Sequence, residues 1–189
     1  MERIALGDAP STGVGASSDR RDLSEPLGAT GVAINRYRLA PGDGFPGGLH
    51  AHADQEEVFV VREGEATFET LDGEVTVGAG EAVRFAPGEF HSGRNASGEP
   101  LVALAIGAPR ETADVRLPVA CSACDHSDLR LAGDAHSTLV CPACGGEYRP
   151  APCPSCGCDD LRMTRSGGST VAVCADCGAE FDRPPLRGE

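Results

Sequence analysis

The chain has 189 residues, with 29 acidic side chains against 16 basic ones and a formal net charge of −13 at pH 7. Such an acidic surface repels polyanions, which counts against nucleic acid as a partner. The sequence has neither the roughly 18 uninterrupted apolar residues of a membrane span nor the charged-then-apolar start of a secretory signal, so we expect a cytoplasmic protein with no membrane partner.

All 16 basic residues are arginines, and the sequence contains no lysine. A lysine-free, acidic composition rich in Ala, Val and Gly resembles that of proteins from salt-adapted archaea, whose acidic surfaces stay soluble in concentrated salt. The alternative is an ordinary acidic protein from a GC-rich genome, because GC-rich codons also favour arginine over lysine. We favour a halophilic archaeon as the source.

Changes in composition predict a mainly β chain with three kinds of segment. Residues 1–28 are polar and rich in Ser, Gly and Pro, and we expect them to form a flexible N-terminal arm. Residues 29–112 alternate short strand-like runs with glycine turns, which is typical of an all-β sandwich or barrel. All nine cysteines follow, between Cys121 and Cys177. A linker is therefore expected over 113–120.

Two histidines lie two residues apart in the stretch GLHAHADQEE. Because side chains alternate along a strand, His50 and His52 share one face and their imidazoles can converge. Glu57 opens the following strand, and His91 comes after a Pro-Gly turn at the end of a later one. Three imidazoles and one carboxylate suit Fe, Mn, Ni, Co, Cu or Zn and leave positions for water or substrate. Glu56 has the wrong spacing and is expected to face solvent.

The spacing of these residues resembles the two motifs of the cupin superfamily. The residues that match the motifs are Gly44, His50, His52, Glu57, Gly64, Gly80, Gly88, His91 and Asn95. Ala86 departs from the pattern, since it stands at the usual proline position with Pro87 after it. The resemblance covers residues 30–108 and implies a small jelly-roll barrel whose three histidines and Glu57 bind one divalent metal. The alternative is a barrel whose histidines hydrogen-bond one another and hold no metal.

Arginines near the motif strands are candidate anchors for an anionic ligand. They are Arg36, Arg38, Arg84 and Arg94. The alternative is that they are solvated partners of the many carboxylates. Five phenylalanines are expected in the core and the pocket wall, namely Phe45, Phe59, Phe68, Phe85 and Phe90.

The cysteine-rich part is a duplicated unit, expected over 121–149 and 150–183 and followed by a tail over 184–189. Each copy begins with C-x-x-C, has DLR four residues after its second cysteine, and ends with C-x-x-C-G-x-E and an aromatic residue. The copies resemble zinc ribbons, in which four thiolates hold a structural zinc ion. The resemblance implies one zinc on Cys121, Cys124, Cys141 and Cys144, and a second on Cys153, Cys156, Cys174 and Cys177.

Other chemistry for these cysteines stays open. Disulfides are disfavoured because the chain has no export signal. Rubredoxin-like iron would make the unit an electron donor, and cross-braced pairing would let the middle two knuckles share an ion. Cys158 in the second copy and His126 in the first occupy the same offset. Either this is a coincidence and Cys158 is a spare thiol, or both residues are alternative ligands during metal exchange.

These features predict a protein that binds or senses a small anionic metabolite through a barrel metal. The part from residue 121 onward carries ten acidic residues and six arginines, a balance of −4, so it lacks a basic stripe for nucleic acid. We expect its ribbons to dock on a protein partner or to self-associate, and the resemblance to cupins implies a homodimer. The alternative is a metal-dependent cupin enzyme, a dioxygenase with iron or an isomerase or decarboxylase with another metal. A nucleic-acid-binding regulator is the least favoured reading.

Overall fold

The computed structural model of the protein describes residues 1–13, 18–133, 135 and 137–188. Residues 14–17 of the expected arm, residues 134 and 136 of the first cysteine unit and residue 189 lie outside the described residues. The regular structure of the described part is entirely β. These residues include no helix long and apolar enough to cross a membrane.

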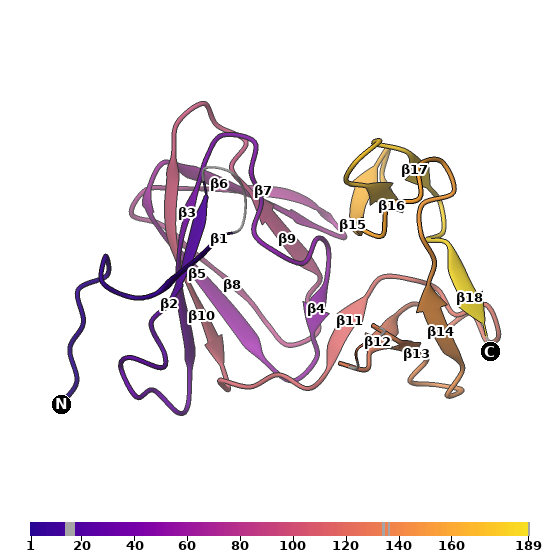
Figure 1. The fold of residues 1–189 in the computed structure, drawn as a ribbon, viewed down its shortest axis with the longest axis horizontal. Coiled ribbons are helices and arrows are strands. Elements are labelled where there is room, and N and C mark those ends of the chain that lie inside the picture. The colour runs from indigo at the N-terminus through magenta and orange to yellow at the C-terminus, as the bar shows by residue number, and fades with distance from the viewer. Residues whose placement is uncertain (14–17, 134, 136, 189) are drawn as a thin grey trace.

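The N-terminal part is a barrel made of two antiparallel sheets, as the sequence predicts (Figure 1). The larger sheet has the order β1-β2-β3-β10-β5-β8, and the smaller has the order β7-β6-β9. The larger sheet consists of β1 (Ser11–Gly13), β2 (Asp19–Asp22), β3 (Ala33–Leu39), β5 (Glu56–Glu63), β8 (Ala82–Phe85) and β10 (Leu101–Ala108). The smaller consists of β6 (Glu65–Thr70), β7 (Gly73–Gly78) and β9 (His91–Arg94).

The barrel core is built around four phenylalanines. Phe45, Phe59, Phe68 and Phe85 are at most 9% exposed. Their ring centroids lie 4.8 to 6.1 Å apart in tilted, edge-on and stacked arrangements. Such aromatic pairs contribute about 0.5–1.5 kcal/mol each beyond the area they bury. The prediction of these residues as core is confirmed.

Gly64 connects β5 to β6 in a conformation that requires glycine. Its φ is +74°, and a Cβ at this position would lie 2.5 Å from the carbonyl oxygen of Pro100. A left-handed backbone and this close approach both exclude a side chain. The motif glycine therefore permits the tight connection from β5 in the larger sheet to β6 in the smaller one.

The segment expected as a flexible arm differs from that expectation, because it contributes β1 and β2 to the larger sheet. Strand β2 pairs with β3, so that Arg20 lies opposite Tyr37. The sequence of β2 is DRRD, a polar strand without the apolar alternation that would reveal it. Its side chains supply the stabilising contacts instead, as when Arg20 Nε donates to Asn35 Oδ1 at 2.8 Å. The next residues, Leu23 and Ser24, are only 2% exposed.

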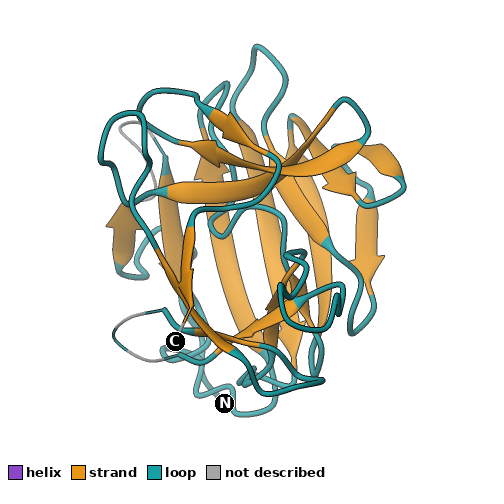
Figure 2. Cartoon of the chain, turned by 90° about the vertical axis from the view of Figure 1, so that its right-hand side faces the viewer, coloured by secondary structure: helices purple, strands orange, loops and turns teal. Residues whose placement is uncertain are grey.

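The C-terminal part forms two further sheets beside the barrel (Figure 1). The first has the order β18-β14-β13-β12-β11-β4 and the second β15-β16-β17. Their strands are β4 (Ala51–His52), β11 (Val115–Leu117), β12 (Leu129–Leu131), β13 (Leu139–Val140), β14 (Glu147–Pro150), β15 (Leu161–Ser166), β16 (Ser169–Cys174), β17 (Glu180–Phe181) and β18 (Leu186–Gly188). Figure 2 shows these strands from the side opposite the barrel. Strand β11 lies in the expected linker, and β18 lies in the expected tail.

A second hydrophobic core joins the barrel to both cysteine units. It contains Leu49 from the barrel, Leu129 and Tyr148 from the first unit, and Met163 from the second. Leu49 is completely buried in this core, and Phe90 packs against it. The cysteine units therefore pack on the barrel through the residue that immediately precedes His50.

Candidate metal centres

The four predicted barrel ligands lie on neighbouring elements at one end of the barrel. His52 belongs to β4, Glu57 to β5 and His91 to β9. His50 pairs with His91 through an isolated antiparallel bridge, with His91 N donating to His50 O at 2.8 Å and His50 N donating to His91 O at 3.1 Å. The backbone thus brings together ligands that are far apart in the sequence.

The side chains of these residues converge on the carboxylate of Glu57. His91 Nε2 lies 2.9 Å and His52 Nε2 lies 3.4 Å from Glu57 Oε2. His50 Nε2 lies 3.1 Å from His52 Nε2. The ligand atoms of His50, His52 and Glu57 all lie within 4.8 Å of one another, and His91 joins them through Glu57. The structure therefore brings together all four residues that the sequence singled out.

Each histidine is bound on its outer nitrogen by a second group. His50 Nδ1 donates to the carbonyl of Gly48 at 2.8 Å, and His91 Nδ1 donates to the carbonyl of Glu89 at 3.0 Å. Because a carbonyl can only accept, the proton is on Nδ1 and the lone pair of Nε2 faces the other ligands. This arrangement is typical of metal-binding histidines, whose orientation is fixed by such outer contacts. The donor set therefore fits a divalent transition metal.

His52 is oriented by a residue from beyond the barrel, Thr112. Thr112 Oγ1 lies 3.3 Å from His52 Nδ1 and donates its own proton to Asp54 Oδ1 at 2.6 Å. Since that proton is committed, the hydroxyl oxygen accepts from His52 Nδ1–H. Asp54 Oδ2 also accepts from Ala113 N at 2.8 Å, and these two bonds hold the pKa of Asp54 below its ordinary value. Sequence reasoning missed both residues, because no spacing rule links Thr112 to a histidine 60 positions earlier.

Burial and neighbouring groups keep His50 and Glu57 in the charge states that a metal requires. Burial lowers the pKa of His50 to about 4, and its bond to Gly48 offsets only part of this, so the imidazole is neutral at neutral pH. Burial opposes ionisation of Glu57, but the His52 and His91 rings beside its carboxylate outweigh that effect and hold its pKa well below the usual range. Neutral imidazoles and an ionised carboxylate are the forms that bind metals.

A small cavity adjoins these ligands inside the barrel. Its volume is about 60 Å³, and its walls include Asn35, Tyr37 and Phe59 beside the ligand side chains. Burial raises the pKa of Tyr37, so its hydroxyl stays neutral at neutral pH. The cavity thus combines the metal ligands with neutral hydrogen-bonding groups and aromatic walls.

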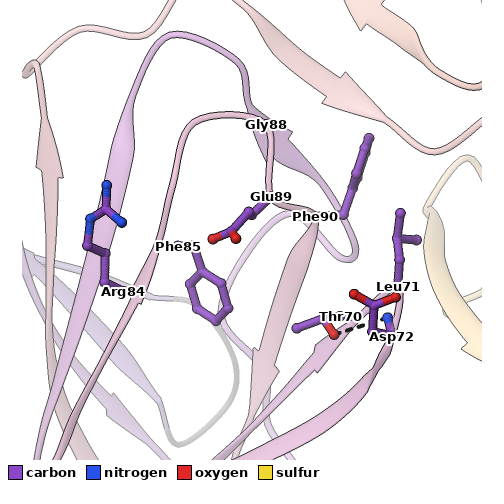
Figure 3. Close-up of a pocket in the computed structure, with 8 residues that line it drawn as sticks. All are labelled: Thr70, Leu71, Asp72, Arg84, Phe85, Gly88, Glu89 and Phe90. Atoms are coloured by element: carbon purple, nitrogen blue, oxygen red, sulfur yellow. Dashed lines mark hydrogen bonds between the residues drawn. The ribbon is translucent and has the colours of Figure 1, made fainter.

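A larger hollow of about 420 Å³ lies at the turn between β6 and β7 (Figure 3). Arg84, Leu71 and Asp72 line it together with Phe85. The Phe85 ring also stacks on the His91 imidazole, with centroids 4.1 Å apart and planes at 4°. Phe85 therefore contacts both the hollow and a barrel ligand.

The four candidate arginines do not line the barrel cavity described above. Arg84 pairs with Glu56 at 2.6 Å and Arg94 pairs with Glu74 at 2.7 Å, all four side chains being more than 40% exposed. Arg36 and Arg38 alternate along β3 with Asn35 and Tyr37, which line the cavity, so they project from the other face of the sheet. The structure therefore places none of these arginines in the wall of this cavity, because strand parity and surface carboxylates direct them elsewhere. Glu56 faces solvent, as expected.

The eight knuckle cysteines form two separate groups of four. One group is Cys121, Cys124, Cys141 and Cys144, and the other is Cys153, Cys156, Cys174 and Cys177. Within each group the sulfur atoms approach to 3.5–3.7 Å. None of the nine cysteines forms a disulfide. This sequential grouping, in place of cross-braced or disulfide pairing, is compatible with two small zinc-binding modules.

The two cysteine groups differ in the contacts of their sulfur atoms. In the first, the hydroxyl of Tyr148 accepts from Ser122 Oγ and donates to Cys121 Sγ, both at 3.2 Å. This bond lowers the pKa of the Cys121 thiol to about 6. The second copy has Phe181 at the same place and lacks the hydroxyl. Cys158 stands apart from the four sulfurs of its group, and its Sγ accepts from Asp160 N at 3.3 Å.

Comparisons with known proteins agree with the fold of the barrel. A family model described as the cupin domain matches residues 35–107. The chain has no significant match among curated protein sequences. The matched residues include all four candidate barrel ligands and end before the first cysteine.

Solved structures of similar fold include three with named activities. The polyketide cyclase RemF from Streptomyces resistomycificus has a TM-score of 0.54 and 24% identity, over 65% of this chain and 88% of that one. A sugar phosphate isomerase from Silicibacter pomeroyi has a TM-score of 0.53 and 15% identity, over 93% of this chain and 94% of that one. A predicted oxalate decarboxylase from Thermotoga maritima has a TM-score of 0.50 and 22% identity, over 57% of this chain and 98% of that one. At these identities the likeness concerns the fold alone, and together with the family match it supports the cupin superfamily for the barrel.

Proposed function

We propose that the barrel binds one divalent transition metal through His50, His52, Glu57 and His91, and that this metal binds a small anionic metabolite. The observation that carries the proposal is the convergence of His52 Nε2 and His91 Nε2 on the Glu57 carboxylate, with His50 Nε2 beside His52 Nε2 and every Nδ1 hydrogen-bonded to an outer partner. A barrel that merely buried these histidines would have no need to fix all three imidazoles in one tautomer. Three imidazoles and one carboxylate leave coordination positions for a ligand.

The size of the cavity limits that ligand to a few atoms. A single water needs roughly 10–15 Å³ of such space, so about 60 Å³ accommodates roughly four or five non-hydrogen atoms. This favours a short carboxylic acid over a sugar phosphate or a polyketide, the classes named for two of the structural neighbours. The acid named for the Thermotoga maritima neighbour, oxalate, is close to this size.

The metal supplies the positive charge for such an acid, because no arginine is among the residues that line the described cavity. Asn35 and Tyr37 offer neutral hydrogen-bonding groups to the ligand. Asn35 Oδ1 already accepts from Arg20, so its amide nitrogen is the group left to donate. We expect recognition to consist of carboxylate binding to the metal, with these two side chains setting orientation and size.

Titration of the cobalt-loaded protein with short acids tests the proposal. The protein, with zinc in its cysteine groups, is loaded with Co²⁺, and its visible spectrum is followed as formate, glycolate or oxalate is added. Short acids should change the spectrum to a saturating limit, whereas citrate should leave it unchanged. His91→Ala should abolish the response to short acids. A spectrum that no acid changes, or that changes equally in His91→Ala, contradicts the proposal.

Catalysis at the same site is the second candidate function. It is favoured by the phenol of Tyr37 in the wall of the cavity. A neutral hydroxyl beside an open metal position can donate or accept a proton. Release of CO₂ from oxalate, or uptake of O₂ with iron loaded, would reveal it. Tyr37→Phe should then lower turnover while the spectral titration stays unchanged. Turnover that is absent with every metal leaves binding as the function.

A further inference from the structure

We propose that the two cysteine units clamp the segment carrying His50 and His52, so that metal bound by the cysteines strengthens metal binding in the barrel. The proposal rests on the proposed function of the barrel as a metal site. It goes beyond that function by giving the cysteine units a partner within the same chain and a task at the barrel site. The clamp comprises residues 112–116 and 163–165, which contact the barrel.

The first half of the clamp is an added strand. Strand β11 pairs with β4, placing Val115 opposite His52 and Arg116 opposite Ala51. Ala53 N then donates to Asp114 O at 2.8 Å. The same stretch of chain supplies Thr112, which accepts from His52 Nδ1. Backbone and side chain of His52 are therefore both held by residues that lead into the first cysteine unit.

Strand β11 is in turn anchored to the first cysteine unit. Its other edge pairs with β12, so that Leu117 lies opposite Leu129. Arg116 forms an ion pair with Asp114 and a second one, of 2.9 Å, with Asp128. Asp128 is the acidic residue of the DLR motif, four residues after Cys124. The motif thus connects the metal knuckle to the strand that supports His52.

The second half of the clamp contacts the residues just before His50. Leu49 N donates to the carbonyl of Met163 at 2.7 Å. Gly48 has a φ of +65°, and a Cβ on it would lie 3.0 Å from the same carbonyl oxygen, so glycine permits the approach. Gly48 O also accepts from His50 Nδ1. Strand β15 therefore contacts the residue that orients the His50 ring.

Strand β15 also binds the sheet that carries His91. Glu69 accepts from Thr164 Oγ1 at 2.9 Å and from Arg165 N at 3.0 Å. Arg165 Nη1 donates to the carbonyl of Thr70 at 3.1 Å, and Thr70 lies opposite His91 in the β6–β9 ladder. The second unit therefore contacts the barrel on both sides of the ligand cluster.

Metal in the second cysteine group governs whether β15 can hold this position. Strand β15 pairs with β16 along its whole length, and Leu161 lies opposite Cys174 at the metal end. A three-stranded module of this size folds largely through its metal, since its apolar core is small. Loss of that metal should release Met163 from Leu49. Energetic coupling between two sites is reciprocal, so barrel metal should equally stabilise the cysteine metal.

Barrel affinity measured in variants of the second unit tests the clamp. Cys156→Ser/Cys177→Ser removes two exposed ligands of that group, and the dissociation constant of Mn²⁺ in the full-length barrel is measured by competition with a chelator. We expect binding about tenfold weaker, the range seen when outer supports of metal ligands are lost. Glu69→Gln should weaken it about fivefold, because one of the two acceptor oxygens becomes an amide nitrogen that cannot accept.

Glu74→Gln is the matched control, because Glu74 lies directly opposite Glu69 on β7 but pairs with Arg94 at the surface. It should leave Mn²⁺ affinity unchanged. Unchanged affinity in the cysteine variant, with one zinc lost, overturns the clamp. If circular dichroism shows that the barrel of the cysteine variant is unfolded, the test rests on Glu69→Gln and Glu74→Gln. Equal Mn²⁺ affinities in these two variants overturn the clamp. If the wild type binds no ion beyond those that His91→Ala also binds, the proposed function of the barrel is overturned, independently of the clamp.

Discussion

The hydroxyl of Thr112 accepts a hydrogen bond from His52 Nδ1 at 3.3 Å and donates one to Asp54 Oδ1 at 2.6 Å. Thr112 follows the last barrel strand, so a residue outside the cupin motifs orients one of the motif ligands. The chain of contacts from imidazole to hydroxyl to carboxylate restrains the His52 side chain. It also fixes the ring so that Nε2 faces Glu57.

Replacing Thr112 should therefore weaken the barrel metal without unfolding the barrel. In Thr112→Val the shape is kept but the acceptor is lost, and we expect about tenfold weaker metal binding. Thr112→Ser keeps the hydroxyl and should stay close to the wild type. Chelator competition on the two variants gives the comparison, and equal affinities would show that the hydroxyl does not orient His52.

The Tyr148 hydroxyl distinguishes the two cysteine groups, since it donates to Cys121 Sγ. A hydrogen bond to a thiolate stabilises its charge, so Tyr148→Phe should speed zinc release from the first group by about tenfold. The second group, with Phe181 in that place, is an internal control. Stopped-flow release to a coloured chelator should show one accelerated phase, and two unchanged phases would contradict the assignment.

Gly64 should be the most sensitive glycine of the barrel. Gly64→Ala combines a left-handed φ with a clash against Pro100 O, and we expect a loss of about 2–4 kcal/mol in the free energy of unfolding. Gly31→Ala is the control, because an added Cβ there meets nothing within 4 Å. Denaturant unfolding of both variants measures the difference. Similar midpoints would mean that the β5–β6 connection is adaptable.

Neutralising the surface arginines should have little effect. Arg84 and Arg94 form exposed ion pairs with Glu56 and Glu74, and such pairs contribute about 0–1 kcal/mol. Arg84→Gln and Arg94→Gln should therefore unfold near the wild-type midpoint and leave the response to short acids intact. A large loss of acid binding in either variant would restore the arginines as ligand anchors.

The ligands were predictable from the sequence because their spacing is local. His50, His52 and Glu57 fall within eight residues, and His91 follows a turn at a motif distance. The repeated C-x-x-C knuckles likewise predicted which cysteines would group. The apolar, aromatic character of the phenylalanines likewise predicted their place in the core. For the metal ligands and the cysteines, the signal is a short spacing along the chain.

The supports of the ligands were not predictable, because they join segments that are distant in the chain. Nothing near Leu49 indicates that its amide will bond to Met163, and nothing near Thr112 indicates contact with His52. Strand β2 was missed for a different reason. Its residues are all polar, and it is stabilised by side-chain hydrogen bonds such as that of Arg20, which leave no hydrophobic period.

Metal content per chain tests the barrel site most directly. The wild type and the His50→Ala/His91→Ala variant are purified without an affinity metal, and their metals are counted by plasma mass spectrometry. We expect two zinc ions and one further transition metal in the wild type, and two zinc ions alone in the variant. Two zinc ions and nothing more in both proteins would contradict a metal-binding barrel.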